Sequence, residues 1–127
     1  MIKTSNNKVL TTHEVAERFN ELAQQEKWFD IQDELFAENV KSVEPPHSPY
    51  LKYAEGKIPV RKKGEDFVSK ILELHGANTT TPVISNNHFA IGRCMDINTK
   101  DFGRIKIDEI IVYEVKDGQI VLEQFFY

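Results

Sequence analysis

The sequence contains a single cysteine, Cys94, among its 127 residues. One cysteine excludes an internal disulfide and every metal or redox motif that needs a CxxC pair, and we expect Cys94 to be a small buried hydrophobic residue. Long apolar runs are also missing, so no membrane span is expected. The first ten residues, MIKTSNNKVL, have no apolar segment of signal-peptide length, which predicts a cytoplasmic protein.

The sequence also lacks an excess of positive charge. Lysine and arginine number 16 against 20 aspartates and glutamates, a net charge of −4. Proteins that bind a phosphate backbone usually carry the opposite balance, so we expect no nucleic-acid partner and no membrane partner. The cluster formed by Arg61, Lys62 and Lys63 is typical of a solvated loop.

Several catalytic motifs are absent. There is no glycine-rich phosphate loop and no GxSxG elbow, and His13-Glu14 does not continue to HExxH because position 17 is glutamate. The four histidines share no spacing that would place them together on one element. We therefore expect no metal and no cofactor, and acid/base chemistry if there is catalysis.

The length and the 40% hydrophobic content fit one domain, residues 1–127, with one core. Thr11 and Glu14 form a capping-box pattern before a helical repeat, which predicts a first helix over 12–27. The repeat that begins at Trp28 predicts a second helix to about residue 38. A third helix is expected around 68–75, ending at Gly76.

A long loop is expected between the second and third helices. The segment opens as a short strand, VKSV, and then carries prolines that exclude a continuous helix or central strand, namely Pro45, Pro46, Pro49 and Pro59. The loop also carries His47, Tyr50 and Tyr53. It is either a lid or rim of a pocket, or a surface excursion whose aromatic rings rest on the core.

The rest of the chain reads as strands at about 80–85, 88–98, 103–116 and 119–127. Helices followed by hairpin-linked strands indicate an α+β fold with the helices on one face of the sheet. Two of the strands exceed ten residues, and strands of that length twist strongly. The sheet should therefore curl around the helices.

The dipeptide Asp117-Gly118 is typical of a two-residue hairpin turn, which pairs Lys116 with Gln119. Counting outward from the turn gives one largely apolar face, on which Glu109 pairs with Phe126, Ile111 with Gln124, and Tyr113 with Leu122. Glu109 then faces the core and Asp108 the outer surface. A β-bulge near residues 110 and 111 would reverse this, making Asp108 the inward acid.

Arg93 lies on the apolar face of the preceding strand and needs a partner there. The loop at residues 100–103 allows two registers, which place Arg93 either diagonal to Glu109 or directly opposite it. Two interpretations follow for Glu109. It is either half of a partly buried ion pair with Arg93, or an acid that lines a cavity with Arg93 and whose pKa depends on burial against that charge.

The last third of the chain, residues 86–127, reads NNHFAIGRCMDINTKDFGRIKIDEIIVYEVKDGQIVLEQFFY. This segment resembles the SnoaL-like polyketide cyclase family of the nuclear transport factor 2-like superfamily. The resemblance implies a cone-shaped α+β barrel, with a curved, largely antiparallel mixed sheet wrapped around three helices and enclosing a pocket. It also implies a homodimer formed through the outer sheet face, which here would use Ile110, Val112, Val121 and Phe125.

Members of this superfamily include cyclases and steroid isomerases that move protons beside a ketone with a pocket carboxylate, and others that only bind ligands or proteins. The resemblance thus implies an isomerase, cyclase or hydratase for a small apolar or carbonyl ligand. Glu109 would be the base, and Tyr113 or Arg93 would stabilise an enolate oxygen. The histidine and aspartate pair of the cyclases has no matching motif here. The alternative is a non-catalytic dimeric module that binds a ligand or a protein. Expected ligand-binding residues are Trp28, His47, Tyr53, Met95, Ile111, Leu122, Gln124 and Phe126.

Overall fold

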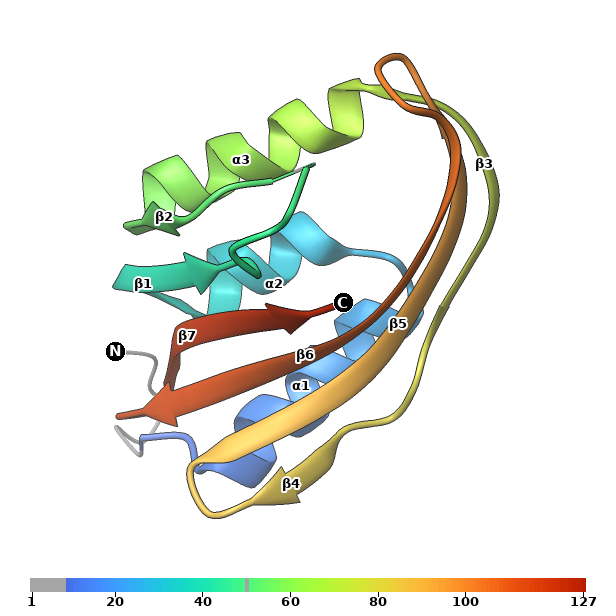
Figure 1. Cartoon of the computed structure of the whole chain (residues 1–127). Coiled ribbons are helices and arrows are strands. Elements are labelled where there is room, and N and C mark those ends of the chain that lie inside the picture. Colours follow the sequence, from blue (N-terminus) through green and yellow to red (C-terminus); the bar gives the residue numbers. More distant parts are fainter. Residues whose placement is uncertain (1–8, 50) are drawn as a thin grey trace.

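The computed structural model describes residues 9–49 and 51–127 (Figure 1). It has three helices, α1 (Thr12–Gln24), α2 (Trp28–Leu35) and α3 (Lys57–Ser69). The strands are β1 (Phe36–Val43), β2 (Ala54–Glu55), β3 (Ile71–Thr79), β4 (Val83–Ser85), β5 (His88–Thr99), β6 (Gly103–Lys116) and β7 (Gln119–Phe126). The predicted α+β class is confirmed.

The strands form one mixed sheet in the order β2-β1-β7-β6-β5-β3, with β4 added beside β5. β1 and β7 run parallel, and the remaining pairs are antiparallel. The long strands β3, β5 and β6 bend around the side on which the helices lie, as the resemblance implied (Figure 1). This curvature produces a concave inner face and a convex outer face.

The predicted capping box begins α1. Thr11 Oγ1 accepts a hydrogen bond from the Glu14 backbone N–H at 3.1 Å, and Glu14 Oε1 accepts one from the Thr11 N–H at 2.9 Å. The apolar face of the helix is buried, and the Phe19 ring lies 5.1 Å from Phe89 and 4.7 Å from Tyr113, measured between ring centroids. These rings form the centre of the core, and α1 ends three residues before the predicted boundary.

The third helix lies earlier than predicted. Residues 71–79 form strand β3, which pairs antiparallel with β5, while α3 ends at Ser69. The predicted helix rested on the spacing of Val68, Ile71, Leu72 and His75. Most of β3 is exposed, including Leu72 and Leu74, so the strand shows no alternation of buried and exposed apolar residues. Pro59 is compatible with α3 because it stands in the first turn, where a backbone N–H has no partner within the helix.

Contacts with α2 hold α3 in place. Arg61 donates hydrogen bonds to the Phe29 carbonyl at 2.8 Å and to Gln32 Oε1 at 3.0 Å. The basic cluster at residues 61–63 therefore lies in a helix and not in the expected solvated loop. A Cβ at Gly64 would lie 3.1 Å from the Phe29 ring, which explains why glycine occupies this position. The two helices thus form one wall over the concave face of the sheet.

The predicted hairpin turn is confirmed at Asp117 and Gly118, which both have positive φ angles, 52° and 76°. Lys116 pairs with Gln119, and Val115 with Ile120, as expected. Beyond these two pairs the predicted register is wrong, because a β-bulge in β7 at Val121 makes Glu114 the partner of Leu122.

The bulge changes which residues of β7 face inward. Glu123 now pairs with Tyr113, and Phe125 with Ile111, so both share the concave face with Glu109. Leu122, Gln124 and Phe126, which were predicted to face inward, point to the convex side by alternation. β6 itself pairs continuously with β5, and Glu109 therefore keeps its predicted inward position.

The β5–β6 hairpin adopts the second of the two registers considered. Thr99 pairs with Gly103 around a three-residue loop, and Arg93 stands directly opposite Glu109. On the convex side of the same pair of strands, Cys94 is exposed and its Sγ lies 3.4 Å from Asp108 Oδ1. The expectation of a buried cysteine is therefore wrong.

Candidate active site

A cavity of about 760 Å³ lies between α2, α3 and the concave face of β5, β6 and β7. Its volume falls within the range typical of small-molecule sites, roughly 300–1,000 Å³. The predicted residues that line it are Trp28, Arg93, Met95, Glu109, Ile111 and Tyr113.

Glu109 lies in this cavity with no hydrogen bond or ion pair to any other residue in the described part of the chain. Burial raises the pKa of its carboxyl group to about 7, and the nearby charges of Glu44 and Glu123 act in the same direction, while Arg93 opposes them. A carboxyl group with such a pKa is present in both protonated and ionised forms near neutral pH. It can therefore give or take a proton there.

Of the two interpretations of Glu109, the ion pair with Arg93 is not formed, although the two residues are strand partners. The buried Arg93 guanidinium donates to Thr79 Oγ1 at 2.8 Å and to Glu26 Oε1 at 3.0 Å. It also stacks over the Trp28 ring, 4.3 Å from the centroid, and the Trp28 indole N–H donates to the same Glu26 oxygen. Glu26, which sequence reasoning missed, thus takes the role expected of Glu109.

Tyr113 is 2% exposed, and among the described residues its hydroxyl has no hydrogen-bond partner. Its ring stacks on Phe89 with centroids 5.0 Å apart, which fixes its orientation at the cavity wall. Burial raises the pKa of this phenol well above its ordinary value, so the hydroxyl keeps its proton at physiological pH. A hydroxyl at the cavity wall that has no partner among the described residues is available to a ligand.

A second acid, Glu123, lines the cavity from β7 and was missed because the bulge was not foreseen. It is 8% exposed, and the Ser42 hydroxyl donates to its Oε2 at 2.7 Å. Burial raises the pKa of Glu123 to about 7 despite the Ser42 hydrogen bond and the Lys63 charge. The cavity therefore holds two acids that titrate near neutrality, in contrast to the single acid expected.

Lys63 connects this acid to a third carboxylate at the end of β1. The Lys63 ammonium lies 2.7 Å from Glu44 Oε2 and donates to Ser42 Oγ at 2.7 Å. The Tyr127 hydroxyl donates to Glu44 Oε1 at 2.6 Å. Glu44 thus has two direct partners, and the positive charge of Lys63 is shared between two acids.

The long loop contributes less to this cavity than predicted. His47 is exposed and does not line the cavity, and its Nε2 lies 3.0 Å from the Tyr127 carbonyl oxygen. Tyr53 is 54% exposed, donates to Glu55 Oε1, and lines a second, smaller cavity. Tyr50 lies outside the described residues. Among the described residues 44–49 and 51–56 of this loop, Leu51 lines the main cavity.

The β7 residues Leu122, Gln124 and Phe126 do not line the cavity, because the bulge turns them to the convex side. Over residues 9–49 and 51–127, no three histidine, cysteine, aspartate or glutamate side chains are grouped so that they could hold a metal ion. No helix within the same residues is long and apolar enough to cross a membrane.

A family model for the SnoaL-like domain matches residues 10–127. Among solved structures, a Mesorhizobium loti protein provisionally called a SnoaL-like polyketide cyclase is 29% identical, with a TM-score of 0.86, covering 93% of this chain and 100% of that one. No curated protein matches the chain.

More distant structures share the fold. A Bacillus subtilis protein provisionally called an isomerase is 22% identical, with a TM-score of 0.65, and the match covers 91% of this chain and 88% of that one. A Catenulispora acidiphila protein with a ketosteroid isomerase-like fold, solved with trimethylamine, is 14% identical. Its TM-score is 0.68, and the match covers 92% of this chain and 87% of that one.

Proposed function

The chain belongs to the SnoaL-like domain family, and we propose that it is a cofactor-independent isomerase, cyclase or hydratase acting on a small carbonyl compound. The observation that carries this proposal is Glu109, an acid without a bonding partner among the described residues, inside a cavity of ligand size. A carboxylate kept only for structure would be expected to have a hydrogen-bonded partner at this depth.

In the proposed reaction, the ionised Glu109 takes a proton from the carbon next to the carbonyl group. The electrons of that C–H bond form the enolate, and its oxygen accepts a hydrogen bond from Tyr113. Tyr113 is preferred over Arg93 for this role, because the guanidinium already donates to Glu26 and Thr79. Return of the proton from Glu109 to another carbon would give isomerisation.

Glu123 supports the same chemistry as a second proton carrier. Glu109 and Glu123, with pKa values of about 7, disfavour ionising together, because the charge of Glu123 raises the pKa of Glu109. One protonated and one ionised carboxyl group is therefore the favoured arrangement near neutral pH. Such a pair supplies a base and an acid within one site.

Hydrogen–deuterium exchange next to the carbonyl group tests the proposal. We expect the protein to catalyse exchange in a panel of small ketones in heavy water, followed by NMR, with a rate that rises as pH passes through about 7 and Glu109 ionises. Ketones that raise the melting temperature without exchanging would favour the non-catalytic, ligand-binding alternative. A catalysed rate that is constant between pH 5 and pH 9 would count against Glu109 as the base.

A homodimer through the convex sheet face remains part of the proposal. Ile110 and Phe126 are strand partners there and are each 49% exposed, with Val112 beside them. Phe125, one of the predicted interface residues, instead lines the cavity. The interface is therefore centred on Ile110 and Phe126.

We expect light scattering to give a dimer mass at micromolar concentration and Ile110→Lys to give a monomer, because a buried ammonium without a partner opposes association. Ile58→Lys is the matched control, since Ile58 is 81% exposed at the start of α3. A monomer mass for the unaltered chain would refute the interface.

A further inference from the structure

A second cavity of about 370 Å³ lies against an adjacent face of α3, between that helix, the segment at residues 51–54 and the tip of the β5–β6 hairpin. Its α3 residues are spaced three and four apart, so they form one face of the helix. The apolar part of the lining comes from Leu51, Ala54, Pro59, Phe67, Phe102 and Ile105. The proposed isomerase, cyclase or hydratase reaction assigns no role to this cavity.

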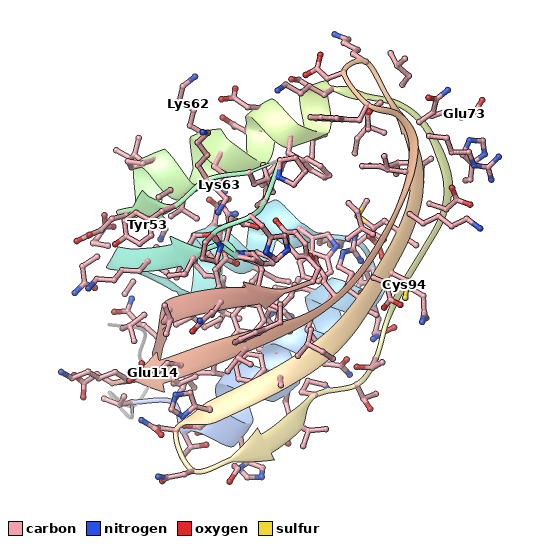
Figure 2. The ribbon with its side chains drawn as sticks, in the orientation of Figure 1. Tyr53, Lys62, Lys63, Glu73, Cys94 and Glu114 are labelled. Carbon is pink, nitrogen blue, oxygen red and sulfur yellow. The ribbon has the colours of Figure 1, made fainter. Side chains whose placement is uncertain are left out.

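The two cavities are neighbours. Among the described residues, three line both cavities: Leu51, Lys63 and Phe67. Lys63 turns towards the sheet and Glu44, while Lys62, the next residue along α3, projects into solvent (Figure 2). An elongated ligand in the second cavity would therefore extend towards the main cavity past Leu51 and Phe67.

The second cavity has a positive lining in a protein of net charge −4. Four lysines (52, 62, 63 and 70) and two aspartates (66 and 101) line it, which leaves 4 − 2 = +2. Lys63 is paired with Glu44 at 2.7 Å and Lys70 with Asp101 at 3.1 Å. Lys62, which is 75% exposed, forms a longer ion pair of 3.7 Å with Asp66. Lys52 is exposed and has no ion pair among the described residues.

The main cavity has a more acidic lining, in which five acids (Glu26, Asp30, Asp108, Glu109 and Glu123) stand beside four basic residues (Lys27, Lys63, Arg93 and Lys106). An anionic group is therefore more favourable beside the lysines of the second cavity than in the main cavity. The two cavities therefore differ in charge and share a boundary that includes Leu51, Lys63 and Phe67. A molecule with one anionic end and one uncharged end would have a single favourable orientation.

We propose that the second cavity binds the anionic end of an amphipathic ligand whose uncharged carbonyl end extends into the main cavity. This substrate class rests on the proposed function. Lys52 and Lys62 attract the anionic group at the rim, and the side chains of Leu51 and Phe67 contact the chain that joins the two ends.

Calorimetry with a medium-chain oxo acid and its methyl ester tests this, because the pair differs in charge at one end only. We expect the unaltered protein to bind the acid roughly tenfold more tightly than the ester. The double variant Lys52→Gln/Lys62→Gln should lose most of this preference, and rising salt should weaken binding of the acid but not of the ester.

Lys41→Gln/Lys116→Gln is the control, because both lysines are exposed, line neither cavity, and change the net charge equally. It should keep the preference. Glu109→Gln should also keep the preference for the acid over the ester. The experiment therefore tests the binding proposal independently of the proposed proton transfer. Equal affinity for acid and ester, no binding of either, or an unchanged preference in the Lys52/Lys62 variant would overturn the proposal.

Discussion

Glu109→Gln is expected to lower the rate of ketone proton exchange by roughly 100-fold or more, because an amide has the shape of the acid but cannot take a proton at neutral pH. Glu17→Gln is the matched control. Glu17 is exposed on α1, lines neither cavity, and loses the same charge in the variant.

Thermal stability separates a catalytic role from a structural one. At pH 8 Glu109 carries a charge, and burial of that charge destabilises the folded protein. The neutral amide of Glu109→Gln should therefore raise the melting temperature while the exchange activity falls. A large loss of stability together with the loss of exchange would instead show that Glu109 holds the fold. Unchanged exchange in Glu109→Gln would remove it from the mechanism.

The free energy of unfolding is expected to fall by about 3 kcal/mol as pH rises from about 4.5 to about 7. Glu109 and Glu123 have folded-state pKa values raised above the ordinary value of 4.5. Within this window the folded protein therefore binds more protons than the unfolded chain, and each increase in pH favours unfolding. The two acids interact, so their contributions should not add fully.

Urea unfolding at pH 5, 6, 7 and 8 measures this slope. Glu109→Gln and Glu123→Gln should each flatten it, and both variants should exceed the unaltered protein in stability at pH 8. Glu17→Gln should leave the slope unchanged. Acids whose pKa is lowered by ion pairs, such as Glu34 beside Arg18, lose their contribution only at lower pH and fall outside the window. Stability that rises with pH across the window would contradict the burial of both acids.

Features set by local sequence were predictable. The capping box of Thr11 and Glu14, the turn at Asp117 and Gly118, and the extent of β6 all follow from residues close together in the chain. The position of α3 was not predictable from periodicity. Its start depends on Gly56, which has a positive φ, and on contacts with α2. The spacing of Val68, Ile71 and Leu72 indicated a helix, although Val68 and Leu72 are exposed.

The candidate site was predictable on β6 and not on β7. Glu109 and Tyr113 follow from alternation along an unbroken strand. Glu123 depends on a bulge, and the end of β7 has apolar and aromatic residues on both faces, so hydrophobicity could not show which face was inner. Arg93 donates a hydrogen bond to Glu26. Glu26 lies in the turn between α1 and α2 and has a positive φ of 57°. Such a contact depends on tertiary structure.

The bulge at Val121 also bears on sequence comparison and on engineering. A relative that lacks the residue equivalent to Val121 could form a regular strand without a bulge. The residues after the deletion would keep their partners on β6, so the counterpart of Glu123 would still face the cavity. A relative one residue longer, with no second bulge, would exchange the two faces and present the counterparts of Leu122 and Gln124. A one-residue deletion here therefore leaves the same β7 side chains in the cavity, whereas a one-residue insertion replaces them with side chains from the other face.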